Sequence, residues 1–419
     1  MIEYEGPAER VYLVGISPAD GGPTDALLAE LGALTETLGM RTAGREIVRI
    51  RDASPRYLLG TGKAAEIVER ARAVDADVIV FDEELSPTHQ RNWEQLADCS
   101  VTDRQGIILE IFAERAQTRE ARLQVELARL EYLLPRLTSA WSHLSRQRGG
   151  RRGTRGEGET QLEMDRRVVQ QRIAGIRRDL RGVTGQRAVS RRQRTELPIP
   201  NGSIVGYTNA GKSSLLRALT RSEVLVANKL FATLDPATRR LELDGGQEVL
   251  LTDTVGFIRR LPHGLVDAFR STLEETVLAP FLIHVIDASD PFAGDHARIT
   301  RDVLGEIGSR DKPTIQVLNK IDTVEMAELD LVRLEFPEAI PVSAVTGSGL
   351  DALRAKIRDV ITTSYARIDV VIPHARYDLA ALIHRTGRVL EERHVDGTVA
   401  IRADVPERTR RMVEEYSSA

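Results

Sequence analysis

A glycine-rich stretch, Gly206–Ser213 (GYTNAGKS), carries the most readily interpreted chemistry in this sequence. It has the spacing G-x-x-x-x-G-K-[S/T], follows an apolar run and precedes a segment of helical character. In such a strand–loop–helix unit, backbone N–H groups and the helix N-terminus surround phosphate oxygens. We therefore predict that Lys212 contacts the β- and γ-phosphates and that Ser213 holds Mg²⁺. The residues expected around the phosphates are Gly206, Asn209, Ala210, Gly211, Lys212, Ser213 and Ser214.

A second motif, Thr252–Gly256 (TDTVG), follows the apolar strand end EVLL downstream of the loop. An aspartate at the end of a strand can hold Mg²⁺, either directly or through water. Asp253 is therefore expected to share the metal with Ser213. The motif has little weight alone, but its place after the phosphate loop makes it informative.

The motif Asn319–Asp322 (NKID) follows another apolar strand and predicts the base of the nucleotide. A carboxylate at Asp322 can accept hydrogen bonds from both N1–H and the exocyclic amine of guanine, a donor pair that adenine lacks. Such a match discriminates strongly, because the wrong base leaves buried polar groups unpaired. A further strand ends at SAVTG, 343–347, where a backbone N–H can bind the guanine O6. The residues expected to bind the base are Asn319, Lys320, Asp322, Ser343 and Ala344.

Composition narrows the class of protein. The chain has 419 residues, which suggests two to four domains, and 42% of them are hydrophobic, which excludes wholesale disorder. The single cysteine, Cys99, excludes a disulfide framework or a cysteine-based metal site. The sequence has no apolar run near the length of a membrane span, and the N-terminus lacks the features of a secretory signal. We expect a cytoplasmic protein without a membrane span.

Charge is distributed unevenly along the chain. Between Arg146 and Arg194 there are 15 arginines and five acidic residues, although the whole chain has a net charge of −4. Such asymmetry indicates a polyanionic partner. Inside this region, the Gly/Arg-rich stretch Gly149–Gly158 is expected to be a flexible loop with exposed arginines. The residues expected to contact RNA are Arg146, Arg148, Arg151, Arg152 and Arg155.

The predicted fold class is α/β, with four parts. Residues 1–112 alternate strands and helices, as in a small parallel α/β domain. Residues 113–197 contain two helices with stripes of leucine and isoleucine, which predict a long hairpin, and a basic linker at 183–197. Strand–helix alternation returns over 198–365, which contain the nucleotide motifs and form the P-loop GTPase domain. Residues 366–419 are predicted to be a small C-terminal α+β domain, read as a β-α-β unit.

The motifs together resemble those of the TRAFAC class of P-loop GTPases, and longer runs resemble the HflX family of the Obg–HflX superfamily. The runs that carry this resemblance are VGYTNAGKS (205–213), LFATLDPATR (230–239), TDTVGFIRRLPHGLVDAFRSTLEE (252–275), DRQGIILEIFAERAQTREARLQVELARLEYLLPRL (103–137) and RGEGETQLEMDRR (155–167). The resemblance implies a ribosome-associated GTPase that binds the large ribosomal subunit and splits or rescues stalled or idle ribosomes. The sequence departs from the family pattern at Glu157, where proline is usual, and at Arg151 and Arg152, where small or apolar residues are more usual.

The resemblance also implies how hydrolysis proceeds. Thr233 matches the switch-one threonine that binds Mg²⁺, and the Gly256 N–H would contact the γ-phosphate. Ras-like enzymes orient the attacking water with a glutamine after this glycine, but Phe257 stands here and cannot hydrogen-bond water. We therefore expect slow hydrolysis by the isolated protein. Asn209 is either a K⁺ ligand, as in potassium-activated relatives, or a turn-forming residue, and the sequence leaves both open.

Two other functions remain as alternatives. One is an ATP-dependent RNA remodeller, with a second nucleotide bound by the N-terminal stretch LLGTGKAAEIVER (58–70), which contains Lys63 but lacks the full P-loop spacing. The other is a GTPase switch with a protein or membrane partner. A lipid-binding segment would place large apolar residues among its arginines, and 146–158 has none. We expect a monomer that uses GTP and releases GDP.

Overall fold

The structure is a computed structural model. It describes residues 8–18, 24–50, 53–137, 155–195, 199–220, 230–231, 234, 236–244, 246–259, 270–363, 365–395 and 397–417, without side chains at 155–162, 184–195 and 270–272. The described residues divide into two compact units, one up to Thr184 and the other from Gly185 onward, and each is described by itself. Among the described residues, no helix combines the length and apolarity needed to cross a bilayer.

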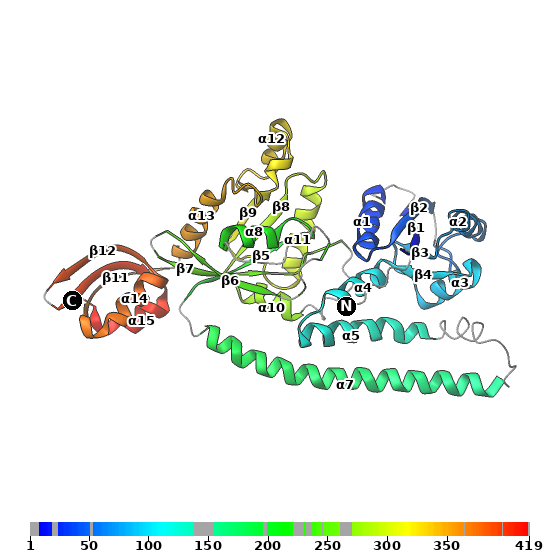
Figure 1. The fold of residues 1–419 in the computed structure, drawn as a ribbon, viewed down its shortest axis with the longest axis horizontal. Helices are drawn as coiled ribbons and strands as arrows, with labels where there is room; N and C mark the ends of the chain where they lie inside the picture. Colours follow the sequence, from blue (N-terminus) through cyan, green and yellow to red (C-terminus); the bar gives the residue numbers. More distant parts are fainter. Residues whose placement is uncertain are drawn as a thin grey trace. The chain divides into compact units, whose positions relative to one another are not determined.

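The first unit begins with a four-stranded parallel sheet of order β2-β1-β3-β4 (Figure 1). Its strands are β1 (Arg10–Pro18), β2 (Arg41–Ile50), β3 (Val78–Phe81) and β4 (Ser100–Asp103), and its helices are α1 (Thr24–Thr37), α2 (Thr61–Ala73), α3 (Pro87–Ala97) and α4 (Arg104–Arg115). The predicted parallel α/β domain is therefore confirmed. The strand β4 and helices α3 and α4 were not separately expected, and α4 crosses the expected boundary after residue 112.

Short polar residues start three helices of this unit. Ser86 precedes α3 and accepts a hydrogen bond from the His89 backbone N–H at 3.1 Å, with Pro87 as the first helical residue. Asp103 caps α4 by accepting from the Gly106 N–H at 2.9 Å. Thr118 caps the next helix, α5 (Arg119–Leu133), in the same way. The side chains satisfy N–H groups that have no partner inside the helix, so local sequence determines where these helices begin.

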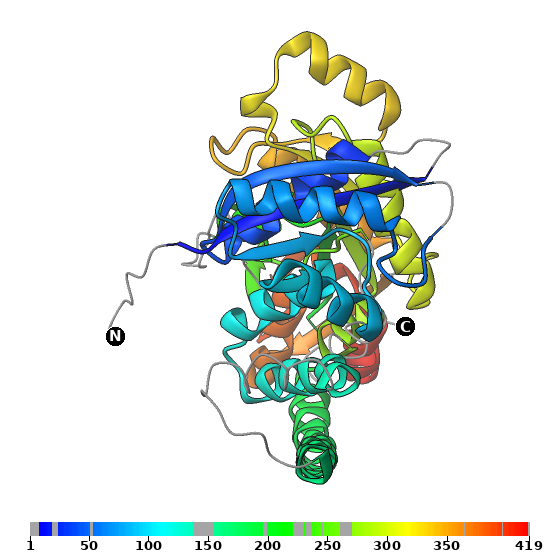
Figure 2. The same ribbon diagram turned by 90° about the vertical axis from the view of Figure 1, so that its right-hand side faces the viewer.

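The predicted helical hairpin is formed by α5, a short 3₁₀ turn η1 (Leu134–Arg136) and α7 (Arg155–Thr195). The two helices lie side by side in Figure 1, and Figure 2 shows α7 along its axis. The expected stripe on α7 packs inward, with Ile173 and Ile176 buried. The pairs Arg172–Glu126 and Arg177–Glu131 join the helices at 2.7 Å. Because these pairs are exposed, most of the hairpin's stability comes from the apolar contacts.

Two expectations for the hairpin are wrong. Glycine was expected to prevent helix formation throughout Gly149–Gly158, but α7 begins at Arg155 and includes Gly156 and Gly158. Residues 183–197 were expected to be a linker, but α7 continues to Thr195. Glycine disfavours a helix by only about 1 kcal/mol relative to alanine, which packing over a long helix can offset. The rest of the stretch, 149–154, lies outside the described residues.

The second unit contains a six-stranded sheet of order β10-β9-β8-β5-β7-β6, in which only the β6–β7 pair is antiparallel. Its strands are β5 (Asn201–Gly206), β6 (Ala237–Glu242), β7 (Glu248–Asp253), β8 (Phe281–Asp287), β9 (Thr314–Asn319) and β10 (Ile340–Pro341). Its helices are α8 (Lys212–Thr220), α10 (Arg270–Leu278), α11 (Ala293–Glu306), α12 (Met326–Glu335) and α13 (Leu350–Thr362), with the 3₁₀ turn η2 (Ile321–Thr323). Parallel strands place their carboxyl ends at one edge, which is where such sheets bind ligands.

The chain ends in a smaller layer of the same unit. An antiparallel sheet of order β11-β13-β12 buries one face against two helices, as the small α+β domain was predicted to do. Its elements are β11 (Ala366–Pro373), η3 (His374–Arg376), α14 (Tyr377–Thr386), β12 (Arg388–Val395), β13 (Thr398–Val405), α15 (Glu407–Val413) and η4 (Glu414–Tyr416). The expected β-α-β unit did not include β12. The sequence of this strand, RVLEERHV, is largely charged and exposed, so it has no apolar pattern that predicts a strand.

Candidate functional site

The glycine-rich loop joins β5 to α8, as predicted. Gly206 has a φ of +150°, and a Cβ there would lie 2.3 Å from the Val285 carbonyl oxygen of β8. Gly211 has a φ of +89°, and a Cβ there would lie 2.2 Å from Asn319 Nδ2. Both positions therefore require glycine for backbone conformation and for close approach. Asn209, between them, is exposed in the left-handed region with a φ of 60°.

Lys212, the first residue of α8, is buried with 6% of its surface exposed. Its Nζ donates hydrogen bonds to the carbonyl oxygens of Gly206 at 3.1 Å and Tyr207 at 2.7 Å. Burial lowers the pKa of Lys212 to about 8, and the charge of Asp253 opposes this shift. A buried ammonium group held at the mouth of the loop is suited to an anionic ligand.

The second motif reaches the loop from β7. Asp253 is fully buried, and its Oδ2 accepts a hydrogen bond from Ser213 Oγ at 2.6 Å. Gly256 lies directly beside the loop, since a Cβ there would be 2.8 Å from Thr208 Cα and 3.0 Å from Lys212 Nζ. Phe257 is 1% exposed and hydrogen-bonds to the loop through its backbone, so it is a core residue beside the loop.

The third motif meets the loop from β9. Asn319 Nδ2 donates to the Ala210 carbonyl at 2.9 Å, and Asn319 Oδ1 accepts from the Ala344 N–H at 3.2 Å. Lys320 has a φ of 66° and its Nζ lies 2.5 Å from Asp287 Oδ2 at the end of β8. Asp322 is exposed in η2. One buried amide therefore joins three of the predicted motifs.

The fourth motif forms a tight turn after β10. Ser343 is buried, and its Oγ accepts from the N–H groups of Val345 and Thr346 at 3.3 and 3.0 Å. Ser214 is half-buried in the first turn of α8. The structure thus brings together all of the predicted nucleotide residues that it describes, at the carboxyl edge of the sheet.

Several predicted residues lie outside this description. Thr233 is not among the described residues, and neither are Arg146, Arg148, Arg151 and Arg152. Arg155 is described only as the first backbone position of α7. Two polar residues of β8 were not expected from the sequence. The first, Asp287, could have been found because it ends a strand of the sheet, whereas nothing in the pattern marks the second, His284, which is 1% exposed.

A phosphate loop with a buried lysine, an aspartate bonded to the loop serine, and an Asn-Lys-x-Asp turn at a neighbouring strand end together define a P-loop GTPase. Family models match almost the whole chain in four parts. Their descriptions are GTP-binding GTPase N-terminal (25–113), GTP-binding GTPase Middle Region (115–194), 50S ribosome-binding GTPase (201–320) and HflX C-terminal domain (333–415).

Two curated relatives with the same family name match this chain over most of their lengths. The GTPase HflX of Akkermansia muciniphila is 46% identical over 95% of this chain and 94% of its own length. The GTPase HflX of Escherichia coli K12 is 44% identical over 84% of this chain and 83% of its own. A GTP-binding protein from Sulfolobus solfataricus, solved in complex with GDP, is 26% identical over 85% of this chain and 99% of its own, with a TM-score of 0.44. The chain belongs to the HflX family of GTPases, and it is a GTP-hydrolysing enzyme that binds GTP and GDP.

Proposed function

We propose that this GTPase binds the large ribosomal subunit in the cytoplasm and, with GTP bound, promotes splitting or rescue of stalled or idle ribosomes. The observation that carries the proposal is the match of residues 201–320 to the family described as 50S ribosome-binding GTPase. Full-length similarity to the HflX relatives supports extending it to the whole chain. We keep the four-part division at 112, 197 and 365 as part of the proposal, with the chain acting as a monomer.

The proposed nucleotide site follows from the geometry at the carboxyl edge of the sheet. The phosphates lie on the loop around Lys212, and the base lies on the turn that contains Asp322. The phosphate-binding residues are Gly206, Asn209, Ala210, Gly211, Lys212, Ser213 and Ser214, and the base-binding residues are Asn319, Lys320, Asp322, Ser343 and Ala344. The Ala344 N–H, now bonded to Asn319 Oδ1, has to be shared with the guanine O6 on binding.

The oxygen atoms of Ser213 and Asp253 fit a bound Mg²⁺. A serine hydroxyl and a carboxylate lie 2.6 Å apart at the buried end of the loop, and hard cations prefer such oxygen ligands. Thr233 is proposed as a further ligand. When bound, Mg²⁺ neutralises charge on the phosphate oxygens. Lys212 and the Gly256 N–H then hold the γ-phosphate in place.

Hydrolysis by the isolated protein is proposed to be slow, because no glutamine follows Gly256 and the buried Phe257 cannot orient water. The bound ribosome would complete the site. Asn209 is exposed in a turn conformation, which suits either a K⁺ ligand or a turn residue. A higher hydrolysis rate in K⁺ than in Na⁺ at equal ionic strength would favour the K⁺ ligand, and equal rates would favour the turn residue.

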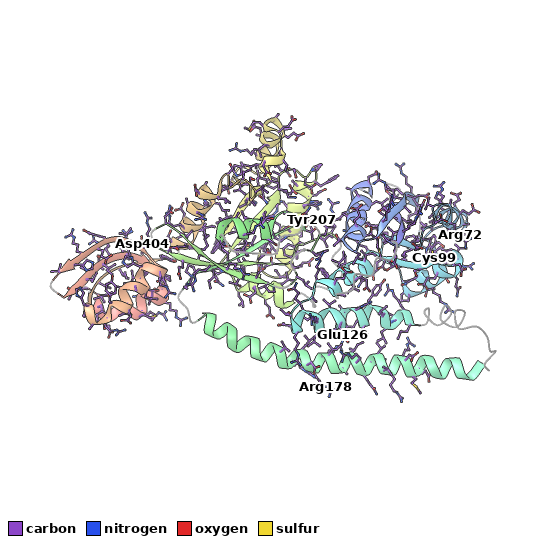
Figure 3. All side chains as sticks on the ribbon, viewed as in Figure 1. Arg72, Cys99, Glu126, Arg178, Tyr207 and Asp404 are labelled. Atoms are coloured by element: carbon purple, nitrogen blue, oxygen red, sulfur yellow. The ribbon has the colours of Figure 1, made fainter. Side chains whose placement is uncertain are left out.

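RNA contact is proposed for the basic region that includes Arg146, Arg148, Arg151, Arg152 and Arg155. The described part of α7 supports a polyanionic partner. It exposes four further arginines that form no ion pair with another described side chain, namely Arg166, Arg167, Arg178 and Arg181. Figure 3 shows Arg178 on the side of α7 away from α5.

The N-terminal stretch 58–70 does not have the features of a second nucleotide site. Lys63 Nζ lies 2.6 Å from Glu46 and 3.0 Å from Glu66, so its charge is already matched by two carboxylates. Gly60 and Gly62 have open space where a Cβ would be, so neither position requires glycine for a close approach. These contacts favour a structural role for Lys63 over a role in binding a nucleotide. They therefore favour the ribosomal function over that of an ATP-dependent RNA remodeller.

The test combines sedimentation with vacant ribosomes and purified subunits. With a non-hydrolysable GTP analogue, the protein should move with the large subunit and convert whole ribosomes into subunits on a sucrose gradient. With GDP it should do neither. Lys212→Ala, which loses the phosphate contacts, should neither hydrolyse GTP nor split ribosomes. Splitting at the same rate without nucleotide would contradict the proposal, and an active Lys212→Ala protein would contradict the site.

A further inference from the structure

Tyr207, the residue after β5, is held by a helix distant in sequence. It is 6% exposed, and its ring stacks on His296 of α11 with the centroids 3.7 Å apart and the planes 6° apart. His296 Nδ1 lies 3.0 Å from Asp290 Oδ2 just before that helix. The flat, close stack and the polar contact fix the direction in which the tyrosine hydroxyl points.

That hydroxyl contacts the segment that follows Gly256. The Arg259 backbone N–H donates to the Tyr207 hydroxyl at 2.9 Å. The Arg259 guanidinium, with a side chain only 11% exposed, lies 3.0 Å from Asp295 Oδ2 of α11. The segment is therefore held at Arg259 by both its backbone and its side chain, and both contacts lead to α11.

The other end of the same segment pairs with the phosphate loop. The Thr208 N–H donates to the Phe257 carbonyl at 2.8 Å, and the Phe257 N–H donates to the Gly206 carbonyl at 3.1 Å. The segment after Gly256 is thus anchored at two places, to the loop at Phe257 and to the Tyr207 hydroxyl at Arg259. Without the Arg259 anchor, the segment would be held beside the loop by the two Phe257 hydrogen bonds.

We propose that Tyr207 is a positioning residue for hydrolysis, which holds residues 256–259 so that the Gly256 N–H meets the γ-phosphate. Tyr207 acts through this segment and does not touch the nucleotide. Since no glutamine side chain assists at position 257, the rate depends on how accurately the backbone is placed. The inference rests on the proposed site only for the role of Gly256.

The first test is Tyr207→Phe, which keeps the ring and removes the hydroxyl. Single-turnover GTP hydrolysis should slow by about 3- to 10-fold, as expected for one lost hydrogen bond, while GDP affinity stays within about twofold. Asp295→Ala, which frees the Arg259 side chain, should slow hydrolysis by a similar factor. The double variant should lose less than the product of the two factors, because both changes act through Arg259.

The matched control is Tyr365→Phe, which removes a hydroxyl that contacts Gln247 away from the loop and should leave the rate unchanged. A rate within twofold for Tyr207→Phe, or a rate loss matched by loss of GDP affinity, would overturn the positioning role. Lys212→Ala separates this outcome from failure of the site. If Lys212→Ala loses activity while Tyr207→Phe stays normal, the site holds and only the inference fails.

Discussion

We propose Asp322 as the residue on which the choice of base depends. It is exposed in η2, and the N–H of the preceding residue, Ile321, donates to the Val342 carbonyl at 3.4 Å. The Asp322 carboxylate is therefore open to an incoming base. Asp322→Asn replaces an acceptor with a donor amide. We expect GTP affinity to fall by at least about 100-fold and XTP affinity to rise, because xanthine offers an acceptor where guanine has its amine.

Competition between fluorescent GDP and unlabelled GTP or XTP measures this change. Thr323→Ala, next in the same turn, is the control and should leave base preference as it was. Equal GTP affinity in Asp322→Asn and the parent would mean that another residue recognises the base.

His284 makes stability depend on pH. It lies fully buried in β8, where burial and then the charges of Arg301 and Lys212 lower its pKa to about 3. Its unfolded value is about 6.5, so between these values the unfolded chain binds a proton that the folded chain does not. The free energy of unfolding is therefore not reduced by this residue above about pH 6.5, and it falls as the pH is lowered from 6.5 toward 3.

Between about pH 7 and pH 5.5 this residue should cost about 1 kcal/mol of unfolding free energy, a cost absent from His284→Leu. Hydrogen exchange of β8 amides at the two pH values measures the difference. The prediction fails if parent and variant lose the same stability on acidification.

Helix α7 provides a comparison between two kinds of contact. Ile176 is completely buried, whereas its neighbour Arg177 forms an exposed ion pair with Glu131. Ile176→Ala should destabilise the first unit by about 2–5 kcal/mol, because it removes buried methyl groups and leaves a cavity. Arg177→Ala should cost about 1 kcal/mol or less, because solvent screens an exposed pair.

Urea unfolding, followed by the fluorescence of the buried Trp93 in the same unit, gives both values. Equal effects of the two substitutions would show that the ion pairs, and not the apolar stripe, hold the hairpin together. The same helix includes Gly156 and Gly158, which were expected to lie in a loop.

At the scale of the whole molecule, ribosome binding should be electrostatic. Replacing Arg146, Arg148, Arg151, Arg152 and Arg155 with alanine should weaken binding and reduce the ribosome-stimulated hydrolysis rate, while intrinsic hydrolysis stays near normal. Each phosphate contact releases counterions, so the slope of log affinity against log salt should fall by up to about 4. Cosedimentation at several KCl concentrations measures this slope.

A control variant removes the same charge elsewhere. Five arginines of the C-terminal layer, each paired with a carboxylate, are suitable, namely Arg367, Arg376, Arg393, Arg402 and Arg410. Their replacement should leave the salt slope almost unchanged. Equal losses in both variants would mean that net charge alone, and not the basic region of the hairpin, determines binding.

Much of the site could be predicted from the sequence by itself, because each of its motifs is a short run of neighbouring residues. The loop 206–213 needs glycines for its own backbone conformation, and strand ends place Asp253 and Asn319 at one edge of a parallel sheet. The α/β class also followed from periodicity, since apolar spacing directly reflects which face is buried. The charged strand β12 was missed for the same reason, because it has little buried surface to mark it.

Only the tertiary structure decided which distant residues support that site. Tyr207 and Arg259 are 52 residues apart, and the stack on His296 and the Lys320–Asp287 pair likewise join residues that no local pattern connects. Glycines 156 and 158 lie in α7, and their local cost in a helix is only about 1 kcal/mol each relative to alanine. Such contacts depend on how whole elements pack in space, which sequence spacing does not encode.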